Sequence, residues 1–284
     1  MIIDTHTHFV PAAISQACRE RRTPPYIEVL PDGGEIFHMP SGPLAFTDAF
    51  EDMEARLDFM KGLGVGRQIL SFPGLFGLDS LPAVECAPLL TAFNDQAAGL
   101  AKAYPESFSG LAALPWEDMD QAIAEYRRAR TELGLIGAIL PNNGFASLAH
   151  AEYFRPFLEA ADALGGHLFI HPGPRPDERK AEGSAPPMDT PPMDTPIARQ
   201  ALGVQNMVSQ CMTTLLFTDY LNPYANFTLH VANLGGTLPM VIERMDHVVA
   251  TRDPEMEMFS ARAAQIHVDC ASLGPRAIRM AAEL

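Results

Sequence analysis

Short apolar runs with strand-like composition alternate with longer segments of helical period along most of the 284 residues. This alternation is typical of a parallel sheet whose strands are joined by crossover helices. The predicted strands are Ile2–Thr5, Arg67–Ser71, Phe108–Leu114, Leu135–Leu140, His167–His171, Asn226–His230 and Gln265–Cys270. The predicted helices are at about Thr47–Gly64, Val84–Tyr104, Glu117–Leu133, Ala151–Leu164, Pro196–Phe217 and Thr237–Ala250. The pattern and the length favour a single α/β barrel domain over residues 1–284.

The number of predicted strands is one short of a closed barrel, because a (β/α)8 TIM barrel has eight strands. After the seventh strand only Pro275–Leu284 remains, which is enough for a short helix. A seven-stranded open sheet would expose two unpaired edges, and such edges promote aggregation. We therefore expect a TIM barrel of the metal-dependent hydrolase type that lacks its eighth strand in this chain. The gap has two explanations, a truncated sequence or a partner that covers it, and we favour truncation.

Two segments have too little periodicity for regular elements of the barrel. Residues 11–46 are polar and rich in Pro and Gly, and they predict a long first βα loop with a small hairpin around Asp32-Gly33-Gly34. Residues 172–195 predict a second long loop, after the fifth strand, and contain a tandem Pro-Pro-Met-Asp-Thr. Long loops in compact domains are usually functional or disordered, so a lid, a substrate wall and disorder all remain open for this one.

The charge and the apolar pattern exclude several classes of partner. The formal net charge of −15 argues against nucleic acid, because phosphate binding requires a basic patch. No apolar run reaches the roughly 20 residues that a membrane span needs. The opening Met-Ile-Ile-Asp is interpreted as a buried strand rather than as a secretion signal, so we expect a cytoplasmic protein. The four cysteines are far apart and predict neither a zinc knuckle nor a disulfide framework.

The residues with the clearest chemistry are two histidines at the end of the first strand, in Asp4-Thr5-His6-Thr7-His8. Residues two apart in a strand point to the same face, so the side chains of His6 and His8 can reach one ion. A strand end also brings them to the catalytic rim of a barrel. We therefore predict that both histidines bind a metal.

Two further strands end in histidine. His171 terminates the apolar Leu168-Phe169-Ile170 and is followed by Pro-Gly, and beside the first motif it predicts a third nitrogen ligand for zinc. His230 terminates Phe227-Thr228-Leu229 and precedes Ala232-Asn233-Leu234-Gly235-Gly236. His230 could ligate the ion or act as an acid/base beside it, and we favour the acid/base role.

These motifs, in this order, resemble the amidohydrolase-related family. Within it they are similar to the branch that contains aminocarboxymuconate semialdehyde decarboxylase and the γ-resorcylate-type decarboxylases. The resemblance implies one divalent metal, commonly zinc, bound by the two histidines of the first strand and the histidine of the fifth. These are His6, His8 and His171 here, and His230 corresponds to the histidine that activates water or moves protons. It also implies an aspartate ligand from the eighth strand.

This chain departs from the family pattern in two places. The Gly-x-Asp-x-Pro segment of the eighth strand has no counterpart before Leu284, and Asp269 on the seventh strand is only a weak substitute for its aspartate. The fourth strand ends Ile139-Leu140-Pro141-Asn142, without the lysine or glutamate that bridges two ions in binuclear relatives. We therefore expect one divalent ion, zinc first and manganese as the alternative.

Together these features predict non-oxidative decarboxylation of a small carboxylic acid, with His230 as the acid/base. Metal-dependent hydrolysis of an ester, lactone or amide is the alternative, and hydration of an unsaturated diacid belongs to the same set. A catalytically impaired barrel that acts as a binding module is a second alternative. Asn142, Trp116 and Arg175 lie on predicted rim loops and are weak candidates for substrate contact. A homodimer is the only protein partner that we expect, by analogy with similar proteins.

Overall fold

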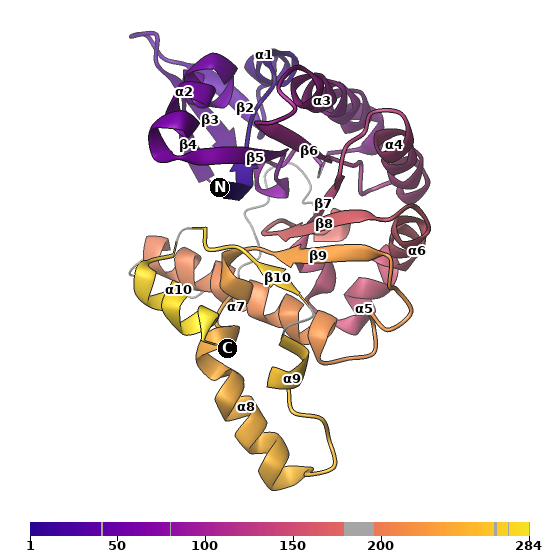
Figure 1. Cartoon of the computed structure of the whole chain (residues 1–284). Coiled ribbons are helices and arrows are strands. Elements are labelled where there is room, and N and C mark those ends of the chain that lie inside the picture. Colours follow the sequence, from indigo (N-terminus) through magenta and orange to yellow (C-terminus); the bar gives the residue numbers. More distant parts are fainter. Residues whose placement is uncertain (41, 80, 179–195, 264–265, 272, 284) are drawn as a thin grey trace.

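Seven parallel strands form the main sheet in the described part of the protein. The computed structural model describes residues 1–40, 42–79, 81–178, 196–263, 266–271 and 273–283. The strands are β1 (Ile2–His8), β5 (Val65–Ser71), β6 (Phe108–Ala112), β7 (Gly137–Pro141), β8 (Gly166–His171), β9 (Phe227–Val231) and β10 (His267–Val268), and they are paired in that order. In Figure 1 the strands follow one another around an arc, with helices on its outer side. The predicted α/β architecture with a parallel sheet is confirmed.

Helices connect consecutive strands of this sheet. The long ones are α2 (Met53–Leu63), α3 (Ala83–Ala103), α4 (Met119–Thr131), α6 (Arg155–Leu164), α7 (Pro196–Leu216) and α8 (Leu238–Arg252), and the short ones are α5 (Leu148–Ala151) and α9 (Ser260–Ala263). One more helix, α10 (Pro275–Ala282), follows β10. The Asp52 side chain caps α2 by accepting a hydrogen bond from the backbone N–H of Ala55. The helix ends at Gly64, whose φ of 70° is the left-handed conformation that glycine adopts at little cost. Among the described residues, no helix is both long enough and apolar enough to cross a membrane.

The first helix of the barrel begins later than predicted. Residues Asp48–Phe50 form a separate 3-10 turn, and α2 starts only at Met53 because Asp52 provides its cap. The strands agree with the predicted ranges to within a few residues, except that β10 is only two residues long. The predicted start of that strand, at residue 265, lies outside the described residues.

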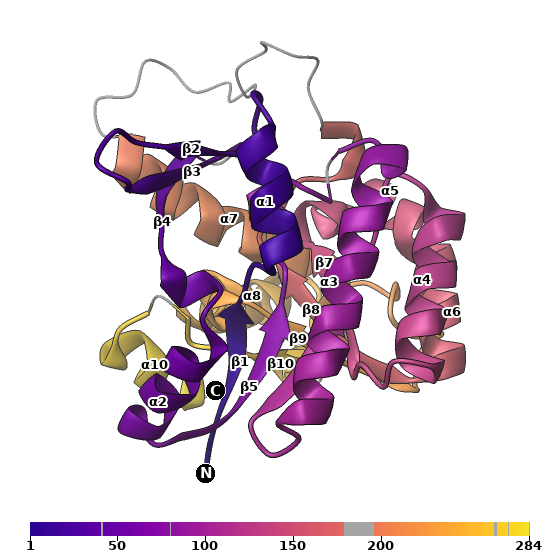
Figure 2. The same ribbon diagram turned by 90° about the horizontal axis from the view of Figure 1, so that it is seen from above.

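The segment 11–46 is more regular than the predicted loop. It forms α1 (Ala12–Glu20) and an antiparallel sheet of β2 (Tyr26–Val29), β3 (Glu35–Met39) and β4 (Gly42–Phe46). The hairpin around Asp32-Gly33-Gly34 is confirmed, but the rest of the loop prediction is wrong. The helix forms because Ile14 and Cys18, four residues apart, bury one face. Figure 2 shows β1 running from the N-terminus towards α1 and the small sheet, so both lie at the carboxyl end of β1.

The second predicted loop, at 172–195, is described only as far as residue 178, where Pro176–Glu178 form a 3-10 turn. The tandem Pro-Pro-Met-Asp-Thr lies outside the described residues. Most of the segment expected to form a lid or a substrate wall therefore lies outside the described residues.

The hydrophobic core has two layers. The larger cluster fills the space between the strands and the surrounding helices. A smaller cluster takes one side chain from each of four neighbouring strands and one from the end of β9, namely Ile69, Leu111, Ile139, Phe169 and Ala232. Because alternate residues of a strand face opposite sides, this small cluster lies on the inner side of the curved sheet. Its Phe169 contacts the histidines described below.

The two end strands of the sheet each have one neighbour within the described chain, since β1 pairs with β5 and β10 pairs with β9. The expectation that the N-terminal strand is buried is wrong at its beginning. Ile2 and Ile3 are 57% and 48% exposed, because none of the described residues forms a strand on the free side of β1. Towards its carboxyl end β1 becomes covered, and this is where its two histidines lie.

Candidate metal centre

Three histidines from distant parts of the chain meet at the carboxyl ends of β1 and β8. One ring nitrogen from each of His6, His8 and His171 lies within 4.8 Å of the others, and within the described chain no other His, Cys, Asp or Glu side chains form such a group. The ring centroid of His171 is 4.8 Å from that of His6 and also 4.8 Å from that of His8. His171 is buried and the other two are partly buried. The three histidines of the sequence motifs thus lie together in space, and their role as metal ligands stays a prediction.

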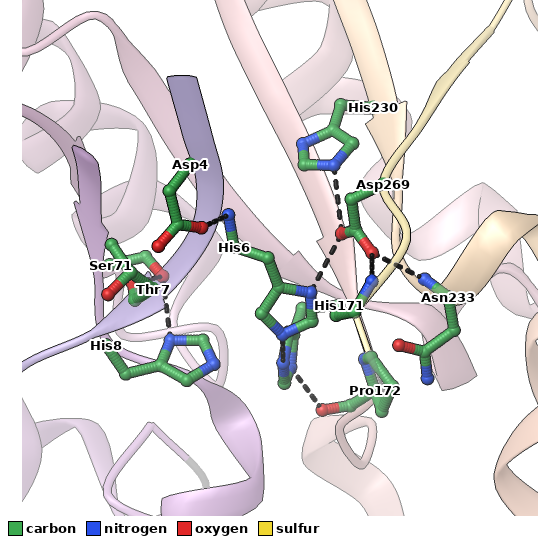
Figure 3. A network of polar contacts seen from close by, with 11 residues as sticks. Asp4, His6, Thr7, His8, Ser71, His171, Pro172, His230, Asn233 and Asp269 are labelled. Carbon is green, nitrogen blue, oxygen red and sulfur yellow. Dashed lines mark hydrogen bonds and ion pairs between the residues drawn. The ribbon is translucent and has the colours of Figure 1, made fainter. Parts of the chain in front are cut away.

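The partner of His6 determines which of its nitrogens carries the proton. Nδ1 lies 2.8 Å from Oδ2 of Asp269, and a carboxylate can only accept a hydrogen bond there. Nδ1 therefore donates, and the lone pair of the neutral ring is on Nε2. Figure 3 shows this contact within the network around the three histidines.

The same reasoning applies to His8 through two linked hydrogen bonds. The hydroxyl of Ser71 at the end of β5 donates its single hydrogen to the carbonyl oxygen of Thr7, at 3.0 Å. Ser71 Oγ therefore acts as an acceptor towards Nδ1 of His8, at 2.9 Å. The lone pair of a neutral His8 is again on Nε2.

His171 completes the pattern with a backbone acceptor. Its Nδ1 donates to the carbonyl oxygen of Pro172 at 2.8 Å, so its Nε2 also carries a lone pair. This Nε2 lies 3.1 Å from Nε2 of His6. Two lone pairs at that distance repel each other unless a positive charge is shared between them. Three neutral imidazoles with their Nδ1 atoms already bonded thus form a donor set that fits a divalent cation such as zinc.

Burial favours the neutral form of His8 and His171. Burial, reinforced by the neighbouring His6, lowers the pKa of His171 to about 3. Burial, together with the nearby His171 and His6, also holds the pKa of His8 well below its usual value. A histidine must be unprotonated to bind a metal, so the electrostatic environment favours the form that a ligand needs.

His230 lies beside the three histidines, at the end of β9, and only 3% of it is exposed. Its ring stacks on Phe169 with centroids 4.2 Å apart and an interplanar angle of 6°. Its Nε2 lies 3.0 Å from Oδ2 of Asp269, the same oxygen that accepts from His6. Its Nδ1 is buried without a hydrogen-bond partner among the described residues. His230 thus lies next to the centre but does not belong to the donor group of the described residues.

Asp269 was considered as a weak substitute ligand, but it does not belong to the group of donor atoms in the described chain. Its Oδ1 accepts from the backbone N–H of Asn233 and Ala271, and its Oδ2 accepts from the two histidines. Burial by itself raises the pKa of Asp269, but the hydrogen bonds from His230 and His6 hold it well below its usual range. The carboxylate is therefore charged and fully hydrogen-bonded.

Two residues that support the centre were not predicted as site residues. Ser71 holds His8 as described above. The partly buried Arg56, from α2, donates to the hydroxyl of Thr7 at 2.9 Å and to the carbonyl oxygen of His8 at 2.8 Å. Arg56 therefore fixes the backbone at the end of β1. The position of Ser71 at the end of a predicted strand was the one available signal for it, and Arg56 had none beyond its place in the first helix.

Aromatic residues line the side of the centre next to His8. The ring of Phe76 lies 6.0 Å from that of His8 and 5.4 Å from that of Phe37 in the small sheet. Phe46 in turn packs against Phe37, at 6.0 Å. This apolar wall, which the segment 11–46 helps to build, excludes water from one side of the centre.

The three weak candidates for substrate contact differ in their surroundings. Asn142, at the end of β7, is 1% exposed and accepts from the backbone N–H of Gly173 at 3.1 Å. Its Nδ2 is buried without a partner among the described residues, so this amide has a donor available for a hydrogen bond. Trp116 is 2% exposed and packs between Phe154 and Phe157, which explains its position by packing alone.

Arg175 follows β8 on the described part of the second loop. Its guanidinium forms ion pairs with Asp177 at 2.8 Å and with Glu178 at 3.0 Å. Two carboxylates thus already neutralise this cation, so it is less suited to bind an acidic substrate than the sequence alone suggested.

The chain is similar to known proteins in sequence. Residues 3–248 match the family model described as amidohydrolase. The chain is 26% identical over 197 residues to a 2-amino-3-carboxymuconate-6-semialdehyde decarboxylase of Dictyostelium discoideum, covering 69% of this chain and 51% of that protein. It is 31% identical over 137 residues to a gamma-resorcylate decarboxylase of Rhodococcus jostii, covering 42% of this chain and 39% of the relative. The chain thus spans about half, or less, of the length of these relatives.

A solved structure shows the same fold. The dihydroxybenzoic acid decarboxylase of Polaromonas sp. JS666, with bound manganese and the inhibitor 2-nitroresorcinol, superposes with a TM-score of 0.64. The superposition covers 99% of this chain and 81% of that one, at 18% sequence identity. At this level of identity the likeness establishes the arrangement of the strands and helices.

Proposed function

The chain belongs to the amidohydrolase family, and on this premise we propose that it is a metal-dependent, non-oxidative decarboxylase of a small aromatic or unsaturated carboxylic acid. The support from relatives is that the two described above are decarboxylases of such acids by name. The observation that carries the proposal is the set of three imidazoles whose Nδ1 atoms are all bonded, so that their Nε2 atoms are available to one cation.

We propose that His6, His8 and His171 bind one divalent cation through Nε2. Zinc is the first choice because three neutral imidazole nitrogens suit it well. Manganese is the alternative because the Polaromonas structure contains it. When bound, the cation supplies positive charge for a substrate carboxylate or hydroxyl oxygen.

In the proposed reaction the bond between the ring carbon and the carboxyl group breaks, carbon dioxide leaves, and the electron pair stays on the carbon. That carbon then needs a proton. In its doubly protonated form His230 would deliver the proton of Nε2, the atom that faces Asp269 and the histidine cluster, to that carbon. The neutral ring left behind would take up a proton from solvent before the next turnover. The stacked Phe169 holds the ring in place, and the apolar wall of Phe76 and Phe37 keeps water from competing as the proton source. The spare Nδ2 of Asn142 is a donor for a substrate oxygen.

We further propose that the active fold is a single eight-stranded barrel domain that includes residues 1–284. One more strand would then lie between β1 and β10, each of which has a single neighbour in the described chain. The resemblance to the family predicts that this strand brings an aspartate to the cation. The cytoplasmic location and the homodimer stay predictions.

The proposal is tested with purified chain loaded with Zn²⁺ or Mn²⁺ and a panel of hydroxybenzoic acids that includes 2,6-dihydroxybenzoate. We expect stoichiometric carbon dioxide and the decarboxylated phenol from at least one acid, and a rate about 10²- to 10⁴-fold lower with His230→Asn under the same conditions. Hydrolysis of lactones or amides by the loaded chain, without carbon dioxide release from any acid, would instead assign it to the hydrolases of the family.

A further inference from the structure

Asp269 joins the two ends of the seven-stranded sheet. It follows β10 at one end, while His6 belongs to β1 at the other end. The two residues are 263 positions apart in the sequence, yet Oδ2 of Asp269 lies 2.8 Å from Nδ1 of His6. The carboxylate is 6% exposed, and Figure 3 shows it between His6 and His230. It is therefore well placed to control both imidazoles.

Both oxygens of this carboxylate are in use as acceptors. Oδ1 accepts from the backbone N–H of Asn233 at 2.9 Å and of Ala271 at 3.0 Å. Oδ2 accepts from Nδ1 of His6 and from Nε2 of His230, the latter at 3.0 Å. A side-chain amide accepts at one end and donates at the other. An asparagine at this position would thus point its N–H₂ at two other donors, whichever way it turned.

We propose that Asp269 is a positioning residue that fixes the proton of His6 on Nδ1 and the proton of His230 on Nε2. In His6 the lone pair is then left on Nε2, the atom 3.1 Å from Nε2 of His171. In His230 the proton is held on the side that faces the cluster. One carboxylate thereby fixes the tautomers of two imidazoles. The roles of the two histidines in metal binding and proton transfer rest on the proposed function, but their tautomers do not depend on a bound metal.

This role differs from that of a metal ligand. Backbone donors hold Oδ1, and two imidazoles share Oδ2, so neither oxygen is free. A carboxylate that orients a ligating histidine makes that histidine more basic, and its loss typically weakens metal binding 10- to 100-fold. The same substitution also removes the acceptor of His230, so it should alter both imidazoles at once.

The first test uses the metal-free chain with ¹⁵N-labelled histidine. Long-range ¹H–¹⁵N correlation spectra at pH 8 report the tautomer of each ring, and His6→Asn and His230→Asn assign the signals. We expect Nδ1–H for His6 and Nε2–H for His230 in the unmodified chain, and a changed or mixed tautomer for at least one of them in Asp269→Asn. An Nε2–H tautomer of His6 in the unmodified chain would overturn the inference, and this result does not depend on whether the variant folds. Unchanged tautomers of both histidines in Asp269→Asn would also overturn it.

Asp162→Asn is the matched control. The Asp162 carboxylate also accepts several hydrogen bonds, from the backbone N–H of Ala225 and the backbone and side-chain nitrogens of Asn226, but in a different part of the molecule. Its substitution should leave the tautomers of His6 and His230 unchanged. A change as large as in Asp269→Asn would mean that the effect is not specific to the proposed contact.

The second test is a Mn²⁺ titration followed by electron paramagnetic resonance. We expect Mn²⁺ binding about 10- to 100-fold weaker in Asp269→Asn than in the unmodified chain. Asp162→Asn should match the unmodified chain. Equal affinities of Asp269→Asn and the unmodified chain would overturn the role of Asp269 towards the cation. If the unmodified chain bound no Mn²⁺, the proposed metal centre would fail, and the tautomers would still decide whether Asp269 positions the two histidines.

Discussion

Two groups of histidines meet inside the curved sheet, and they differ in how their ring nitrogens are bonded. In the cluster of His6, His8 and His171, every Nδ1 has an acceptor. In the stacked pair of His167 and His230, whose centroids are 5.5 Å apart, each ring has one buried nitrogen without a partner in the described part of the chain. These atoms are Nε2 of His167 and Nδ1 of His230.

The difference separates two tasks that imidazoles can perform. A ring with one nitrogen tied to an acceptor presents a fixed lone pair at the other, which is what a metal ligand requires. His230 is bonded to the carboxylate of Asp269 through Nε2, which leaves its lone pair on Nδ1, and it does not belong to the donor group of the described residues. It can therefore take up and release a proton without binding the cation. Substitutions in the two groups should therefore affect metal content and catalysis differently.

The largest effect is expected from His171→Ala, in the first group. It removes the buried ligand of the cluster, so bound Zn²⁺ should fall from one per chain to near zero and carbon dioxide release should fall more than about 100-fold. Metal analysis after dialysis measures the first quantity. The control is His247→Ala, which removes an exposed imidazole from α8 and should change neither. Full Zn²⁺ content in His171→Ala would break the distinction between the groups.

His230→Asn, in the second group, should lower the decarboxylation rate by about 10²- to 10⁴-fold while the Zn²⁺ content stays at one per chain. The reason is that this residue supplies the proton and not a ligand. The rate and the metal content are measured on the same preparation. Loss of the metal together with the rate would move His230 into the first group.

Ser71→Ala tests whether the hydrogen bond at Nδ1 of His8 affects the affinity of the site for the metal. Without the Ser71 hydroxyl, His8 loses its acceptor, and the dissociation constant for Zn²⁺ should rise about 10-fold, at the lower end of the range for such partners. Competition with a chelator of known affinity measures it. Thr131→Val, which removes an exposed hydroxyl bonded to the backbone of α4, is the control. Identical affinities in the two variants would show that His8 does not depend on this contact.

The smallest effect on activity is expected from His167→Phe, which should leave the Zn²⁺ content and the rate at pH 7.5 within about twofold. The variant should instead change the pH dependence of stability. Burial lowers the pKa of His167 from 6.5 to about 4, so the unfolded chain binds a proton that the folded chain does not bind between these values. The contribution of neutral His167 to stability is full above pH 6.5 and is lost as the pH falls towards 4.

Urea unfolding of the metal-free chain at pH 7 and pH 5 measures this effect. Between these values the free energy of unfolding should fall less steeply in His167→Phe than in the unmodified chain, by at most about 1.4 kcal/mol per pH unit. The same slope in both proteins would show that His167 titrates normally.

Much of the site was predictable from the sequence because its signals are local. Alternation along a strand places His6 and His8 on one face, and the ends of parallel strands meet at one rim, which brings in His171 and His230. The seven strands followed from the same periodicity. The helix α1 was missed because its apolar positions, Ile14 and Cys18, are few within a polar, Pro- and Gly-rich segment.

The contacts that hold the histidines were not predictable in this way. Asp269 meets His6 only because the sheet curves until its first and last strands approach each other, and no local pattern encodes a contact over 263 positions. Similarly, the ion pairs of Arg175 with Asp177 and Glu178 depend on how the turn after β8 folds. Periodicity predicts which face a residue lies on, whereas hydrogen-bond partners depend on packing.

The central claim is that Nε2 of His6, His8 and His171 bind one cation. A crystal structure of the Zn²⁺-loaded chain, with anomalous data at the zinc edge, tests it directly. The account predicts one strong peak per chain at about 2.0–2.1 Å from all three Nε2 atoms, with Asp269 still bonded to Nδ1 of His6. A peak at other residues, ligation through Nδ1, or no bound zinc at saturating concentration would contradict it.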